Sequence, residues 1–347
     1  MINKSHSGLP YRECIIERAP KREDVSKDVR RYSKKEIEEE VARYRQYIIS
    51  HRLGKKMSVI MTILGTMVCG LFAVMFLLPL ILTFTNSFMG PEEITADYGS
   101  IFSTSSYGGK VFVSKTVELK FIPDRVTLSQ YFTVLLKSPE YLEKFWNSMI
   151  YTVPIVVFQL IAASMASYGF AKYPSKRKNV LFFFYTIIMM MPYQVTLVPN
   201  YLVANFFHLV DSSWAIWLPG IFSPFAVYLL TKYIRRIPKA IFDAARIDGA
   251  GEWQVYRQIV LPLCKGALAS AAILIFIDYW NMVEQPLILL TDEYKYPLSV
   301  FLSQINQGEI SLAFAVAVIY MVPPLLVFLY GEEYLVNGIV YQGGVKG

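Results

Sequence analysis

The stretch DAARIDGAGEWQVYRQIVLP, from Asp243 to Pro262, is polar and lies between two long apolar runs. Pro238 suits a helix start, and residues 239–247 can form about two helical turns. Gly249 permits the positive φ that ends such a helix, after which residues 250–260 can form a second one. The sequence therefore predicts two short helices that meet at Gly249, outside the apolar layer.

The first of these helices has features that suit contact with another surface. Ala244 and Ala245 give it a face with almost no side chain, so another surface can approach its backbone closely. Asp243 and Asp248 add negative charge near its ends. The segment therefore suits insertion into a groove of a partner, although the same residues also fit a re-entrant loop of helix-turn-helix shape that has no partner.

The spacing D-A-A-x-x-D-G-A, followed by Leu261 and Pro262, resembles the E-A-A-x-x-x-G loop of the permease subunits of ABC importers. In that family the loop forms a coupling helix that enters a cleft of the ATPase subunit. Asp243 stands where the family usually has Glu, and Gly266 stands where a second Pro often follows Leu-Pro. The resemblance implies a coupling role for eight residues: Asp243, Ala244, Ala245, Asp248, Gly249, Ala250, Leu261 and Pro262.

The composition predicts a membrane protein, because 54% of the 347 residues are hydrophobic. Six apolar runs are long enough to cross a hydrocarbon core of about 30 Å. They cover residues 57–84, 146–170, 180–203, 214–232, 265–290 and 310–330. We therefore expect an all-α polytopic protein with six transmembrane helices, for which the resemblance implies the type I ABC importer permease fold.

The net charge of +7 reports topology rather than nucleic-acid binding. Lys and Arg gather in residues 1–56, 172–178 and 232–265, which alternate with the apolar runs. This is the positive-inside pattern, and it predicts that both termini and the Asp243 loop are cytoplasmic. The chain is thus expected in the cell membrane as a multi-pass protein.

The same pattern divides the chain into three parts. Residues 1–56 are expected to form a basic cytoplasmic tail with a short amphipathic helix over about 34–51, since Ser33 and Glu36 make a capping box. The expected transmembrane domain covers residues 57–331. It includes two external segments, residues 85–144 and 291–309, and a cytoplasmic coupling loop, residues 233–263. The expected cytoplasmic C-terminal tail covers residues 332–347.

Polar residues within the apolar runs are candidates for a translocation path. Pro192 and Pro199 leave backbone carbonyls without helical hydrogen bonds in the third run, where polar side chains can donate to these carbonyls. Asp278 lies near mid-membrane in the fifth run, where an ionised carboxylate costs about 2.5–3.5 kcal/mol, so it must face water or a polar neighbour. Helix packing is an equally open role for each candidate. The five candidates are Gln194, Asn200, Asp278, Trp280 and Asn281.

Three further stretches resemble sugar-type permeases. These are N-S-M-I-Y-T from Asn147, the ending G-G-V-K-G after Gly338, and Y-K-Y-P-L-S-V-F-L over residues 294–302. In sugar importers of this type the last segment reaches into the sugar-binding protein. The resemblance therefore implies that Tyr294, Tyr296 and Leu298 contact such a protein.

The chain has no G-x-x-x-x-G-K-[ST] motif, so it cannot cradle ATP by a P-loop. Its three Cys and three His are scattered, which argues against a catalytic, metal or cofactor site. We expect a non-enzymatic subunit that forms half of a carbohydrate path. Its expected partners are a second permease in a hetero-dimer, ABC ATPases that hydrolyse ATP, an extracellular sugar-binding protein and the lipid bilayer, with no nucleic acid. A permease for another solute, or a stand-alone secondary transporter, remains as an alternative.

Overall fold

The structure is a computed structural model, and it describes residues 34–102, 105–107, 110–112, 119–172, 175–305 and 309–340. The chain divides into two compact units, Met1–Leu77 and Leu78–Gly347. The ends of the expected tails, residues 1–33 and 341–347, lie outside the described residues.

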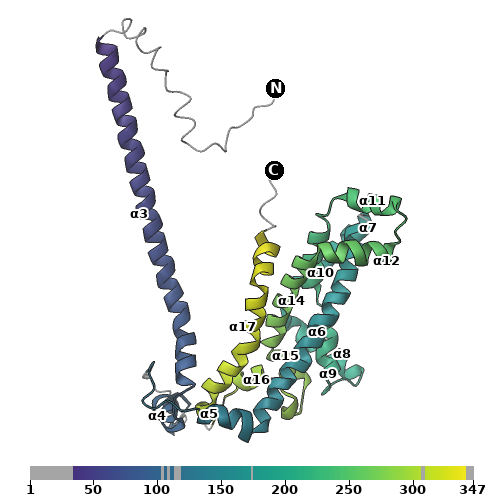
Figure 1. The fold of residues 1–347 in the computed structure, drawn as a ribbon. Coiled ribbons are helices and arrows are strands. Elements are labelled where there is room, and N and C mark those ends of the chain that lie inside the picture. Colours follow the sequence, from purple (N-terminus) through teal and green to yellow (C-terminus); the bar gives the residue numbers. More distant parts are fainter. Residues whose placement is uncertain are drawn as a thin grey trace. The chain divides into compact units, whose positions relative to one another are not determined.

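A single helix, α3 (Lys34–Asn86), begins in the first unit. It replaces the expected separate helix over 34–51, because it continues without a break into the first apolar run (Figure 1). The connecting residues 52–56 contain no proline, and a single glycine such as Gly54 costs only about 1 kcal/mol within a helix. Residues Ile60–Asn86 of α3 are long and apolar enough to cross a membrane.

The second unit is built almost entirely of helices. A short antiparallel pair, β1 (Ser105–Tyr107) and β2 (Lys110–Phe112), places Ser106 opposite Val111. Its earlier helices are α4 (Pro91–Phe102), α5 (Ser129–Phe132), α6 (Pro139–Lys172), α7 (Lys176–Met189), α8 (Tyr193–Phe206), α9 (Ser213–Ile221) and α10 (Pro224–Ile234). The later ones are α11 (Lys239–Ile247), α12 (Glu252–Val255), α13 (Leu261–Leu263), α14 (Lys265–Trp280), α15 (Glu284–Leu289), α16 (Leu298–Ser303) and α17 (Ile310–Val340), with π-helical turns at Thr133–Lys137 and Tyr256–Val260 and a 3-10 turn at Glu293–Lys295.

The expectation of an all-α protein with several spans is confirmed. Among the described residues, four helical segments are long and apolar enough to cross a membrane, and two bent helix pairs raise the number to as many as six. One bent pair is α7 with α8, which turn by 100° at a break that contains Pro192. Proline stops a helix there because it lacks a backbone N–H and excludes the preceding residue from helical geometry.

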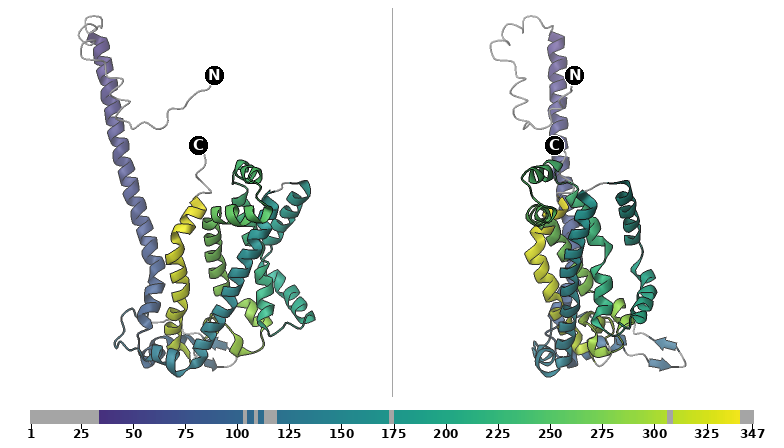
Figure 2. Two further views of the ribbon diagram at one scale, coloured as in Figure 1. Left: turned by 45° about the vertical axis from the view of Figure 1, so that its right-hand side comes forward. Right: turned by 90° about the vertical axis from the view of Figure 1, so that its right-hand side faces the viewer.

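The helix α6 is the centre of the second unit. It packs against α9, α10 and α14, and α14 packs in turn against α17. Buried aliphatic side chains fill these contacts, among them Ile155, Ile216, Leu230 and Ile275. Both views of Figure 2 place α11 and α12 beyond one end of this bundle, whereas α5 and α16 lie at the other. The helix α17 extends past the expected domain boundary at residue 331, to Val340.

The contact between α14 and α17 depends on Gly331. A Cβ atom at this position would lie 2.2 Å from Ile273 Cδ1 and 3.0 Å from Ile273 Cγ1. We expect Gly331→Ala to destabilise the bundle by about 1–3 kcal/mol, because overpacking forces the side chain or the helix to shift. The thermal midpoint of the purified protein measures this loss. Ile273→Val removes Cδ1 and should restore much of the stability of Gly331→Ala, and a double variant no better than Gly331→Ala would contradict the assigned contact.

Candidate functional site

The two short helices meet at Gly249 as the sequence predicts. The helix α11 covers Lys239–Ile247, and Gly249 follows with φ of 76°. The Ala250 N–H donates to the Ala245 carbonyl at 3.0 Å, and the Gly249 N–H donates to the Arg246 carbonyl at 3.0 Å. This pair of bonds is a Schellman motif, which satisfies the last helical carbonyls and requires a left-handed residue at Gly249.

The second helical segment restarts after Gly251. The Gly251 N–H donates to Gln254 Oε1 at 2.8 Å, which caps α12. Val255 and Val260 are buried against Phe242 and Ala245 of α11. The loop thus packs on a small apolar core that it shares with Ile234 of α10 and with Cys264, just before α14.

The outer surface of α11 carries most of the expected coupling residues. Asp243, Ala244 and Asp248 are exposed, whereas Ala245 is buried against the loop core. In the second segment Leu261 is half-buried and Pro262 is exposed. The region therefore presents one face outward and one inward, and Ala245 belongs to the inner face.

The two most exposed large apolar side chains among the described residues of this loop were not singled out from the sequence. Ile247 is 86% exposed on α11, and Trp253 is exposed on α12. Ile247 lies three residues after Ala244, which is the helical spacing that puts both on one face. That spacing is the signal that could have identified it. Exposed apolar groups beside a backbone face with small side chains are typical of a protein contact.

The loop is fastened to the end of α6. Lys172, whose side chain is 2% exposed, forms an ion pair with Glu252 of α12. The Tyr168 hydroxyl donates to Glu252 Oε2 at 2.9 Å and accepts from Lys172 Nζ at 2.5 Å. The hydroxyls of Ser164 and Tyr256 lie 2.8 Å apart in the buried part of the same contact. These contacts connect the loop directly to α6, which is the central helix of the bundle.

The candidates for the translocation path contact residues outside the candidate set. Gln194 of α8 donates from Nε2 to both carboxylate oxygens of Glu284 on α15, at 3.3 and 3.2 Å. Asp278 and Asn281 are exposed on and just after α14, and the side-chain Oδ1 of Asn281 accepts from the Tyr320 hydroxyl at 2.7 Å. Polar groups from α8, α14 and α15 thus lie at surfaces of the helices. Asn200 is half-buried on α8.

Trp280 has the helix-packing role that the sequence left open beside a role in the path. Its side chain is 0% exposed and stacks between Phe276 and Tyr320, with ring centroids 5.5 and 5.4 Å away. Its indole N–H donates to the Tyr320 carbonyl at 3.1 Å. Trp280 therefore packs α14 against α17, and no face of its ring is open to a sugar.

The three expected contact residues of the segment expected as the second external loop differ in exposure. Tyr294 is 70% exposed. Tyr296 is half-buried against the core of the bundle, and Leu298 is buried. The Leu298 N–H donates to Ser148 Oγ at 2.9 Å, which holds the loop on α6. Tyr294 therefore has the most exposed side chain of the three, and Tyr296 is exposed in part.

Asp211 anchors this external loop from the turn between α8 and α9. Its carboxylate accepts from Lys295 Nζ at 2.6 Å and from the Thr291 and Asp292 N–H groups at 3.1 and 3.2 Å. The hydrogen bond from Lys295 and those from the backbone lower the pKa of Asp211 to about 2, from an ordinary value of 3.8. The ionised form is therefore the one that holds the loop.

We expect this anchor to be lost only in acid. Because the pKa of Asp211 is lowered on folding, its contribution is complete above pH 3.8 and disappears as the pH falls to about 2. Asp211→Asn keeps the left-handed backbone and one acceptor but removes the charge, so it should weaken the loop by about 1 kcal/mol. Hydrogen exchange of residues 291–296 should rise about fivefold in this variant. Equal exchange in the two proteins at neutral pH would show that the charge does not hold the loop.

Comparison with known proteins identifies the family. The model of the binding-protein-dependent transport system inner membrane component matches residues 159–340. The chain belongs to this family. It is 33% identical over 236 residues to the arabinooligosaccharides transport system permease protein AraQ of Halalkalibacterium halodurans. This alignment covers 67% of this chain and 84% of AraQ.

Two further relatives agree with this membership. The alpha-glucoside transport system permease protein AglG of Rhizobium meliloti is 33% identical, over 74% of this chain and 68% of its own. The crystal structure of a bacterial ABC transporter involved in the import of the acidic polysaccharide alginate matches with a TM-score of 0.66 and 25% identity, over 79% of this chain and 96% of that chain. The expected importer permease fold is confirmed, and family members are membrane components of transport systems rather than enzymes.

Proposed function

We propose that this chain is a permease subunit of an ATP-driven importer and forms half of the transmembrane path for a carbohydrate. The geometry of the coupling loop carries the proposal: α11 offers an exposed surface with Ala244 and Ile247, and the ion pair of Lys172 with Glu252 fastens the loop to α6. When a partner bound to α11 moves, such a loop can transmit the movement to the helices of the bundle. The similarity to AraQ and AglG supports carbohydrate as the solute.

The other half of the path and the energy come from partners in this proposal. A second permease forms a hetero-dimer with this chain, and two ABC ATPase subunits contact the α11 loops from the cytoplasm. Asp243, Ala244, Asp248 and Ile247 form the contact surface, and Gly249 with Ala250 fixes its angle. Leu261 and Pro262 set the direction in which the chain enters α14. Both chain termini lie in the cytoplasm, as the positive-inside pattern indicates.

A solute-binding protein outside the membrane delivers the sugar, and Tyr294 is the residue of this chain that we propose meets it. Gln194, Asn200, Asp278 and Asn281 are the proposed path residues. Amide and carboxylate groups bind sugar hydroxyls by hydrogen bonds and need no positive charge. The sequence of α8 contains no Lys, Arg or His, and that of α14 contains none after its first residue, Lys265. Trp280 serves helix packing instead.

Uptake of labelled solutes tests the proposal. Proteoliposomes that contain the assembled transporter, its binding protein and internal ATP should accumulate an oligosaccharide and should leave an amino acid, a peptide and a polyamine outside. Accumulation of one of the latter in place of any sugar would support a permease for another solute. Transport by this chain alone without ATP would contradict the proposal and favour a stand-alone transporter.

A further inference from the structure

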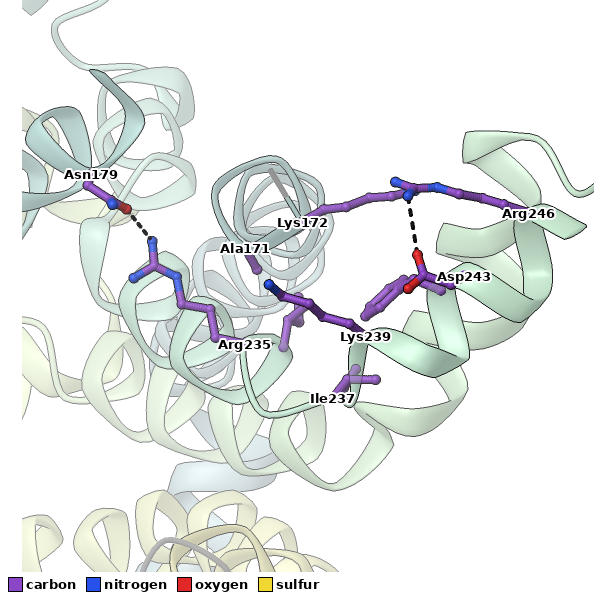
Figure 3. Close-up of a pocket in the computed structure, with 10 residues that line it drawn as sticks. Ala171, Lys172, Asn179, Arg235, Ile237, Lys239, Asp243 and Arg246 are labelled. Carbon is purple, nitrogen blue, oxygen red and sulfur yellow. Dashed lines mark hydrogen bonds and ion pairs between the residues drawn. The ribbon is translucent and has the colours of Figure 1, made fainter. Parts of the chain in front are cut away.

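A basic hollow lies beside the coupling loop, and Arg235, Lys239 and Arg246 of its lining have no role in the proposed transport cycle. It has a volume of about 450 Å³, and Lys172, Arg235, Lys239 and Arg246 line it together with one carboxylate, that of Asp243. In Figure 3, Arg235 and Asn179 lie on one side of the hollow, Asp243 and Arg246 lie on the other, and Lys239 extends between them. Four basic groups around one acid make this a site for an anion.

The basic groups are held in place rather than free to turn outward together. Arg235 donates to Asn179 Oδ1 at 3.2 Å and to the Phe170 carbonyl at 3.4 Å, and its guanidinium lies 4.9 Å from the Phe182 ring centroid. Arg246 pairs with Asp243 at 3.4 Å. Within the described part of the chain, no hydrogen bond or ion pair engages the ammonium of Lys239. That ammonium is therefore available to a bound anion, beside groups that are already arranged.

The hollow also has an apolar part. Ile234, Ile237 and Phe242 line it together with the basic groups. A soluble inorganic anion has no apolar group that could pack on such a surface. A phospholipid has, besides its phosphate, a glycerol group and acyl chains whose first carbons can pack there. The combination of basic rim and apolar wall therefore fits an amphiphile.

The position of the hollow along the spans agrees with a lipid. It lies where α6 ends at Lys172, α7 begins at Lys176 and α10 ends at Ile234. Apolar helices leave the hydrocarbon at such points, so the hollow is expected at the depth of the lipid headgroups of the inner leaflet. Basic pockets between transmembrane helices on the cytoplasmic side are typical sites for anionic headgroups.

We propose that this hollow binds the phosphate group of an anionic phospholipid, with Lys239, Arg235 and Arg246 as its cationic ligands. The lipid would lie against α11 and would thereby tie the coupling loop to the membrane surface. This inference does not depend on which solute is carried.

Retention of phosphatidylglycerol by the assembled transporter tests the inference. The complex is reconstituted in nanodiscs of phosphatidylcholine with phosphatidylglycerol, and native mass spectrometry measures the phosphatidylglycerol that stays bound after detergent extraction. Lys239→Gln should lower the apparent affinity for this lipid about fivefold, because a basic group near a headgroup contributes by about that factor. Lys265→Gln, at an exposed basic residue of the same end outside the hollow, should leave retention unchanged.

Two results would overturn the inference. Equal retention of phosphatidylglycerol by the Lys239→Gln variant and the wild type would remove the hollow as its site. Binding of inorganic phosphate in nanodiscs of phosphatidylcholine alone, dependent on Lys239, with no retention of phosphatidylglycerol, would show that the anion is soluble. Arg246→Gln serves as an independent second variant, and it should lower retention of the lipid as Lys239→Gln does.

Discussion

Gly249→Val should lower ATP-driven uptake by about 30-fold, while the protein still folds and inserts. The φ of 76° at Gly249 is a conformation that β-branched residues adopt only at high cost, which we take as about 2 kcal/mol. No atom lies within 4 Å of the position of a Cβ at this residue, so the penalty is one of the backbone and not of packing. Relief of the strain would break the Ala250 and Gly249 hydrogen bonds and change the angle between α11 and α12.

Gly249→Asn is the matched control for this variant. Asparagine tolerates the left-handed conformation better than other side chains, and its volume is close to that of valine. Uptake by Gly249→Asn should therefore stay within about threefold of the wild type, a difference of less than 1 kcal/mol. Uptake at the same level in the asparagine and valine variants would show that the backbone conformation at Gly249 has no part in coupling.

Glu252→Ala should release the coupling loop from α6. Lys172 then keeps the Tyr168 hydroxyl but loses its carboxylate partner, and its side chain has almost no access to water. A buried cation without its counter-charge costs about 2 kcal/mol or more. We therefore expect hydrogen exchange of residues 252–260 to become about 30-fold faster, and ATP-driven uptake to fall with it.

The double variant separates this effect from the loss of the glutamate itself. Lys172→Met keeps the length of the side chain and removes its charge, so Lys172→Met with Glu252→Ala should exchange more slowly than Glu252→Ala alone. This non-additivity is the interaction that a double-mutant cycle measures. Additive effects of the two substitutions would mean that the ion pair does not fasten the loop.

The features predicted correctly from the sequence are those that local chemistry determines. The end of α11 at Ile247 follows from Gly249, since a positive φ is a property of one residue and its neighbours. The bend between α7 and α8 contains Pro192 for the same kind of reason. The number of apolar runs follows from composition and span length, which need no knowledge of packing.

The features that the sequence did not determine depend on neighbours far along the chain. Trp280 has an aromatic side chain of the kind that stacks on sugars, but Tyr320 of α17 covers its ring. Leu298 lies in a segment that resembles a contact loop, but Ser148 of α6 holds its backbone inside. Glu284 became a partner of Gln194 only through the approach of α15 to α8. In each case the contacts of the side chain depend on which face of its helix or segment packs against another helix.

Purification of the tagged chain from its native host in mild detergent, with mass spectrometry of the proteins that remain bound, shows which subunits assemble with this chain. With the wild type we expect a second six-span permease and a P-loop ATPase. With Ile247→Asp, which places a charge in the middle of the proposed α11 contact surface, we expect the second permease without the ATPase. Recovery of the ATPase at the same level with both proteins would contradict the role assigned to α11, and recovery of the chain alone, active in liposomes without ATP, would contradict its role as an importer subunit.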